Sequence, residues 1–193
     1  LAVAMTVAGI VLFTVLAASK ASEHTVLDPA VIATGCAVII LIGTTLGLLG
    51  WKGPVQWRCL MWASGGSFFY GLSAGMVKAT SEVMRLEDFH GRPVFWVVAP
   101  LLVLSYAVGG FMVQQGLAHG PAEVTVGSMT TTDPIVAVSF GLIVLGEGVN
   151  ITPLIGIGML LGGVLSVWGV VVLSRHHPDA VRPVPATPPP DPA

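Results

Sequence analysis

The chain has very little charge. Only 9% of its 193 residues are Asp, Glu, Lys or Arg, whereas soluble domains typically contain about 25%. The formal net charge is −2 and no run of basic residues occurs. Because nucleic-acid binding needs a concentrated positive surface, this charge pattern argues against it.

Cysteine is almost as scarce. Cys36 and Cys59 both lie in or beside apolar segments, so we predict buried free thiols rather than a disulfide framework or a metal site. The start of the sequence does not have the pattern expected of a signal peptide, since Leu1 stands inside an apolar run with no basic region before it. We therefore expect the sequence to be a fragment that begins inside a transmembrane helix.

Apolar residues make up most of the chain. Hydrophobic residues account for 54% and the mean hydropathy is +0.87, which indicates an all-α polytopic membrane protein. A spanning helix needs roughly 20 apolar residues, and six transmembrane helices are predicted on that basis. They cover Leu1–Ser19, Pro29–Gly50, about Cys59–Val77, Val94–Ala118, Val124–Gly146 and Ile151–Ser174.

Two segments between and after these stretches are polar. Lys78–Pro93 carries six charged residues and is predicted to be a link in water. Residues 176–193 contain seven prolines, which predicts a disordered or polyproline-like tail. Lys and Arg divide four to four between the two sides, so the positive-inside rule assigns no orientation.

Glycines recur at the spacing that lets membrane helices approach closely. Gly43/Gly47, Gly71/Gly75 and Gly158/Gly162 are each separated by four positions, and Gly163 adds to the last pair. Small residues at this spacing predict helix packing by Gly158, Gly162 and Gly163, chiefly within the chain. The first and last stretches share a Met and a Gly at matching positions, as inverted repeats of five helices would produce.

One acidic residue lies within an apolar stretch. Asp133 is near the middle of the fifth segment and directly precedes Pro134. One interpretation is structural, since Asp is a good N-cap and Pro suits the first helical turn. The pair would then begin a half-helix, Pro134–Gly146, after an irregular segment Ser128–Thr132. The other interpretation is functional, because an ionisable group at the bilayer centre is costly and usually belongs to a pathway. Asp133 would then be a proton relay, a cation ligand or a substrate anchor.

Further polar residues are weaker candidates for the same pathway. Near Asp133, hydroxyls would come from Thr130, Thr131 and Thr132; the fourth segment offers Tyr106, Gln114 and Gln115. Lys78 is expected to snorkel to the interface, and Glu147 to be a loop carboxylate or a cap for the sixth helix. No nucleophile–base pattern, phosphate loop or zinc-ligand spacing occurs, so we expect neither catalysis nor a cofactor.

The segment Pro134–Glu147 resembles the late signature of EamA-like proteins of the drug/metabolite transporter superfamily, in which a helix proline is followed by apolar residues and a closing Gly-Glu. The Gly-rich segment Gly156–Leu173 is similar to the family's last helix. Gln115, Gly120-Pro121 and Asp133-Pro134 further resemble a branch akin to NIPA-type magnesium transporters, where Asn is expected before the proline.

The resemblance implies ten helices arranged as two inverted five-helix repeats. Residues 1–19 would then be the last helix of a truncated first repeat and residues 29–175 the second repeat. It implies a multi-pass secondary transporter of the plasma (inner) membrane that moves a small solute by alternating access. The alternatives are a Mg²⁺ transporter and a non-transporting membrane scaffold. The expected partners are the lipid bilayer, a small solute or cation and, if the glycine spacing acts between chains, a second copy.

Overall fold

The computed structural model describes residues 2–19 and 28–176, and every regular element in them is helical. The prediction of an all-α fold is confirmed for this part of the chain. The α-helices are α1 (Ala2–Ala18), α2 (Pro29–Lys52), α3 (Val55–Met84), α4 (Pro93–Ala118), α5 (Ala122–Ser139) and α6 (Pro153–His176). A π-helix, η1 (Phe140–Val144), and a 3₁₀ helix, η2 (Glu147–Asn150), join α5 to α6. The predicted Pro-rich tail from residue 177 on lies outside the described residues.

Four helical segments are long and apolar enough to cross a bilayer: α2, α4, α5 continued by η1, and α6. Helix α1 is apolar but has only 17 residues. Helix α3 is the longest, with 30 residues, yet it is less apolar than α2, α4 and α6. The four segments indicate a membrane protein.

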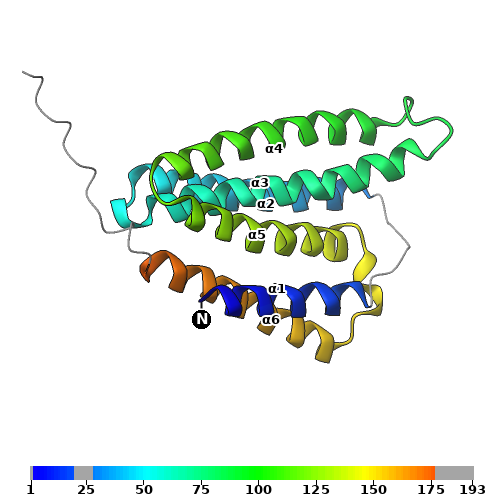
Figure 1. Cartoon of the computed structure of the whole chain (residues 1–193). Coiled ribbons are helices and arrows are strands. Elements are labelled where there is room, and N and C mark those ends of the chain that lie inside the picture. The colour runs from blue at the N-terminus through cyan, green and yellow to red at the C-terminus, as the bar shows by residue number, and fades with distance from the viewer. Residues whose placement is uncertain (1, 20–27, 177–193) are drawn as a thin grey trace, which may run out of the picture.

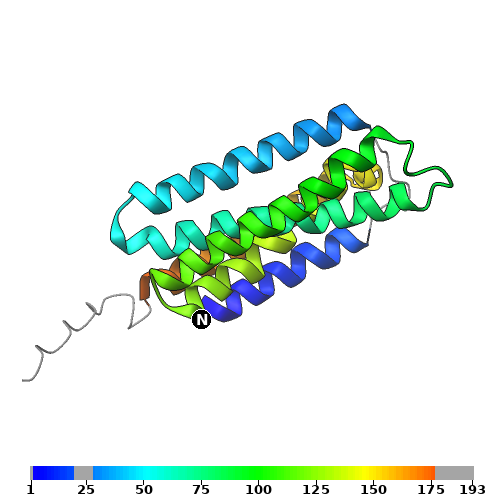
Figure 2. The same ribbon diagram turned by 90° about the horizontal axis from the view of Figure 1, so that it is seen from above.

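Helix α3 lies at the centre of the bundle. It contacts α2, α4 and α5, while α1 and α6 pack against each other and against α5 (Figures 1 and 2). This position explains the polarity of α3, because a helix surrounded by other helices exposes little surface to lipid. Its buried side includes Gly65, Gly66, Ser67 and Ser73, small residues that allow close approach.

Successive helices run in opposite directions. The turns at 53–54 and 119–121 lie at one end of the bundle, and the links 85–92 and 145–152 lie at the other (Figure 1). Exposed tryptophans occur near both ends, with Trp51 66% exposed and Trp96 64% exposed. Tryptophan prefers the two membrane interfaces, so the long axis of the bundle fits the bilayer normal.

The helix ends follow local chemistry, with one correction. Asp28 caps α2, since its Oδ1 accepts the backbone N–H of Ala30 at 2.8 Å, as expected for Asp before Pro29. The predicted link Lys78–Pro93 begins later than expected, because α3 continues to Met84. Charged residues continue a helix readily once it extends beyond the apolar region, so loss of apolarity did not mark its end.

The predicted packing of Gly158 and Gly162 against a neighbouring helix is confirmed, and that helix is α1. A Cβ at Gly162 would lie 2.9 Å from the carbonyl oxygen of Gly9 and 3.0 Å from the nitrogen of Phe13. A Cβ at Gly158 would meet the Leu16 side chain at 2.7 Å, whereas one at Gly163 would find its nearest atoms at 3.9 Å. Gly158 and Gly162 therefore face α1 closely, and Gly163 has ordinary van der Waals space. Both cysteine thiols are free and buried, also as predicted.

Candidate functional site

Asp133 is the middle residue of the apolar segment Ala122–Val144. At 1.5 Å per residue it lies about 16 Å from either end of that segment. The interpretation of Asp133 as a helix cap was wrong, because α5 is continuous from Ala122 to Ser139 and Ser128–Thr132 is helical. Pro134 removes one backbone hydrogen bond, and the packing of α5 against α3 and α6 holds the helix together across it.

Polar neighbours on α5 have partners in adjacent helices. Thr125 contacts the Cys59 thiol at 3.4 Å, Ser128 bonds to Ser64 at 2.9 Å, and Thr131 accepts a hydrogen bond from Ser166 at 3.3 Å. Asp133 differs from them, since its Oδ1 atom is buried and has no hydrogen-bond partner. A buried polar atom without a partner costs about 1–3 kcal/mol, more if charged. Such an atom within an apolar span calls for a functional explanation.

The Asp133 side chain borders an open groove between α3, α4 and α5. We call it the Asp133 groove; its cavity volume is about 430 Å³. Its lining residues are Tyr70, Ser73, Ala74, Val77, Leu102, Tyr106, Met129 and Asp133. The α3 backbone comes close to α5 at this level, because a Cβ on Gly71 would lie 2.9 Å from the Asp133 carbonyl oxygen.

Two aromatic rings stand at this groove. The Tyr70 and Tyr106 centroids are 5.1 Å apart, with their planes tilted by 55°. The tilt and spacing fall within the range of favourable aromatic pairs. Tyr106 is nevertheless 62% exposed, so much of its side chain is free of protein contact. Ser73, which lines the groove, shares a hydrogen bond of 2.9 Å with the buried Ser105 hydroxyl of α4.

The structure brings together two of the predicted pathway residues, Asp133 and Tyr106. The other candidates do not line the groove. Thr130 is exposed and donates back to the Val126 carbonyl at 3.0 Å. Thr131 is buried in the contact with α6 and Thr132 is half-buried, while Gln114 is exposed and Gln115 half-buried. Three consecutive threonines on a helix point in different directions, so one face never holds all three.

Sequence reasoning missed Tyr70, Ser73 and Met129, although a signal for them was present. Along α3 the groove residues are Tyr70, Ser73, Ala74 and Val77, which follow the spacing of one helix face. The pairs Leu102/Tyr106 and Met129/Asp133 are each four residues apart, as neighbours on one face must be. Searching each predicted helix for a polar or aromatic face would have found these residues.

The irregular part of the fifth segment lies beyond Pro134, at its end. In η1 the Leu145 N–H donates to the Phe140 carbonyl at 3.1 Å, a π-type bond across five residues. Gly146 follows with φ of 72°, a left-handed conformation that favours glycine. The closing Gly-Glu therefore reverses the chain direction and brings Glu147 back against the bundle.

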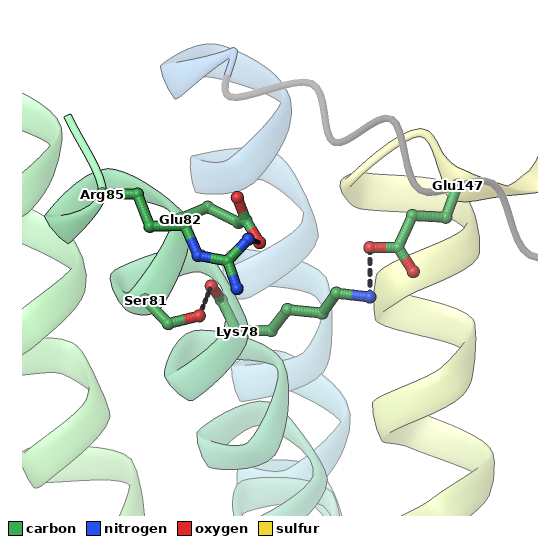
Figure 3. A network of polar contacts seen from close by, with 5 residues as sticks. All are labelled: Lys78, Ser81, Glu82, Arg85 and Glu147. Atoms are coloured by element: carbon green, nitrogen blue, oxygen red, sulfur yellow. Dashed lines mark hydrogen bonds and ion pairs between the residues drawn. The ribbon is translucent and has the colours of Figure 1, made fainter.

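At this turn, Glu147 forms an ion pair with Lys78. The Lys78 Nζ lies 2.6 Å from the Glu147 Oε1, and Figure 3 shows the lysine reaching from α3 to the turn. The Glu147 side chain is only 6% exposed, whereas that of Lys78 is 49% exposed. Nearby, Arg85 pairs with Glu82 at 3.3 Å on the surface (Figure 3).

This ion pair corrects one prediction. Glu147 is neither a solvated loop carboxylate nor a cap of α6, because its side chain is buried against Lys78 before α6 begins at Pro153. The Lys78 side chain is half-exposed, and its position at the membrane interface stays a prediction. Gly141 supplies the space, since a Cβ there would lie 3.0 Å from the Glu147 Oε2. Lys78 and Glu147 are far apart in sequence, so no local sequence pattern predicted this ion pair.

Metal ligation has no cluster to support it in the described part of the chain, where no three His, Cys, Asp or Glu side chains are grouped to hold an ion. Comparisons with protein-family models, with curated proteins and with solved structures gave no match to this chain.

Proposed function

We propose that this protein is a secondary transporter of the drug/metabolite type that moves a small solute across the membrane by alternating access. The observation that carries the proposal is the Asp133 carboxylate. It lies at the middle of an apolar segment, has an unpartnered buried oxygen, and borders an open groove. Intramembrane ionisable residues of this kind mark substrate or ion pathways.

The helix arrangement supports the same proposal. Helices α2 to α6 would form one five-helix repeat, and α1 would be the last helix of another. The contacts of α1 with α6 run in opposite sequence order, from Thr6 near Gly169 to Leu16 near Gly158. An antiparallel pair of corresponding helices is what inverted repeats produce. On this proposal all six helices cross the membrane, including the short α1 and the central α3.

The end of the fifth segment offers a place for movement. The π-helix η1 and the left-handed Gly146 interrupt the regular helical hydrogen bonding along the chain where α5 ends and before α6 begins. Helix irregularities of this type occur often at functional sites. We propose that the groove side of α5 shifts relative to α6 about this interruption when the transporter changes its open side.

Solute uptake tests the proposal. Proteoliposomes containing the full-length protein would be offered a mixture of amino acids, nucleosides and amines, with and without a proton gradient, and the accumulated solutes identified by mass spectrometry. Asp133→Asn should lower uptake of the transported solute about tenfold or more, because a charge-assisted contact contributes about 1.5–3 kcal/mol. Asp88→Asn is the matched control, since Asp88 is an exposed residue outside the helices.

Other results would favour a rival. Near-normal uptake by Asp133→Asn would remove the carboxylate from the mechanism, and an absence of uptake of any solute would favour a scaffold. Uptake of Mg²⁺ that depends on Asp133 would favour the divalent-cation carrier. One carboxylate supplies too few ligands for such a site by itself, because Mg²⁺ requires octahedral oxygen coordination.

A further inference from the structure

The Asp133 groove contains one ionisable acid and no base. Among its eight lining residues, Asp133 is the sole Asp, Glu, Lys, Arg or His. The nearest lysine in the α3 sequence, Lys78, lines a different cavity and places its ammonium 2.6 Å from Glu147. An anionic solute would therefore meet a carboxylate in the groove without any opposing cation.

The rest of the lining suits an apolar body. Ala74, Val77, Leu102 and Met129 supply aliphatic and thioether surface, and the two tyrosines supply aromatic faces. A volume of about 430 Å³ lies in the range of small-molecule pockets, about 300–1,000 Å³. It accepts a solute of one ring with a short side chain.

The aromatic pair adds a preference for positive charge. Ring faces attract cations, and the attraction grows as water is removed. Tyr70 and Tyr106 line one groove with Asp133, and Tyr106 is largely exposed. A carboxylate beside two ring faces forms a site for an ammonium group. A metal ion needs several oxygen ligands instead and gains little from aliphatic walls.

We propose that the Asp133 groove binds a small organic cation, an alkyl- or arylammonium whose charged nitrogen lies between the Asp133 carboxylate and the Tyr70 and Tyr106 rings. This inference rests on the proposed transport function and names its substrate class. The apolar part of the cation packs on Met129 and Leu102, so hydrophobic contact and charge act together.

Binding and transport are tested separately. The full-length protein in lipid nanodiscs would be titrated with three phenyl solutes of similar size, the cation benzyltrimethylammonium, the zwitterion phenylalanine and the anion phenylacetate. We expect saturable binding of the cation alone. Its charge is permanent, so a change of affinity with a variant does not arise from titration of the ligand.

Substitutions locate the site. Asp133→Asn should weaken binding of benzyltrimethylammonium by about tenfold or more, because the variant removes the Coulombic attraction between the carboxylate and the quaternary nitrogen, which has no N–H to donate. Tyr106→Leu should weaken it about three- to tenfold, whereas Tyr106→Phe should retain most of the affinity because the ring face remains. Asp88→Asn should leave it unchanged.

The outcomes separate the two proposals. Equal affinity in Tyr106→Leu and Tyr106→Phe, or preferential binding of phenylalanine or phenylacetate, would overturn the organic-cation inference. Asp133-dependent uptake of one of those solutes into proteoliposomes would still uphold transport. Conversely, Asp133-dependent cation binding without uptake of any solute would support the site and contradict the transporter.

Discussion

Two carboxylates of this bundle, Glu147 and Asp133, have opposite surroundings. Glu147 is nearly enclosed and has the Lys78 ammonium 2.6 Å away. Asp133 is half-buried beside an open groove, and its Oδ1 has no hydrogen-bond partner. The Glu147–Lys78 ion pair has a structural role, since a buried carboxylate with a countercharge holds α3 to the turn after α5. Asp133, whose Oδ1 has no partner within the protein, can still accept a hydrogen bond or a positive charge from a ligand.

The lesson is that burial alone does not identify a functional acid. Glu147 is the more buried of the two, yet its main interaction is internal. A carboxylate whose hydrogen-bonding capacity is used within the protein contributes stability, and one whose capacity is unused is available for a ligand. Substitutions at Lys78, Glu147 and Asp133 test this division, and a substitution at Gly162 supplies a larger packing effect for comparison.

The largest effect should come from the α1–α6 seam, which involves neither acid. Gly162→Ala places a Cβ 2.9 Å from the Gly9 carbonyl oxygen, and backbone cannot yield as a flexible side chain does. We expect a loss of about 3 kcal/mol, seen as a lower melting temperature in detergent. Gly163→Ala is the matched control with 3.9 Å of space. Equal melting of both variants would place the Gly162 face away from α1.

A smaller loss should follow from removing the countercharge of Glu147. Lys78→Met keeps the aliphatic stem but leaves the buried carboxylate without its cationic partner. Breaking a fully buried pair costs about 3–5 kcal/mol; because half of the Lys78 side chain is exposed, we expect about 2 kcal/mol, or a fall in melting temperature of about 4–8 °C.

Adding Glu147→Gln to Lys78→Met should restore part of that stability, because the neutral amide needs no countercharge. Glu147→Gln alone should cost less than Lys78→Met alone, since the half-exposed ammonium turns to water. If the double variant is less stable than Lys78→Met, the interpretation of the Lys78–Glu147 ion pair as a stabilising contact is wrong.

The smallest effect on stability should come from Asp133→Asn. No internal partner of the Oδ1 is lost, so we expect the melting temperature to change by the equivalent of about 0.5 kcal/mol or less. The same variant should lose solute uptake, so stability and function separate at this position. A fall in melting temperature comparable to that of Lys78→Met would show that Asp133, like Glu147, stabilises the fold.

Much of the fold followed from the sequence. Apolar runs of spanning length predicted the all-α bundle and its order, since lipid requires each backbone to satisfy its own hydrogen bonds. The glycine spacing predicted close packing at Gly162, because contact faces repeat every three to four residues along a helix. The central position of Asp133 in its segment was also visible, together with the inference of a polar interior.

Local rules failed where a tertiary contact outweighed them. The Asp133-Pro134 pair has the pattern of a helix start, but packing of α5 between α3 and α6 keeps the helix continuous. The break occurs at η1 and Gly146 instead. The charged residues after Val77 made that segment look short, whereas the helix continues through them to Met84.

The sequence by itself determined that a lone acid would lie deep in an apolar span. Which acid has a partner was decided only by the tertiary structure. Lys78 and Glu147 belong to segments that meet because the chain reverses at Gly146, and Tyr70, Tyr106 and Asp133 come from three different helices. A pairing between distant residues depends on how helices pack against one another. Hydrophobic periodicity identifies the buried face of a helix but not which helix packs against that face.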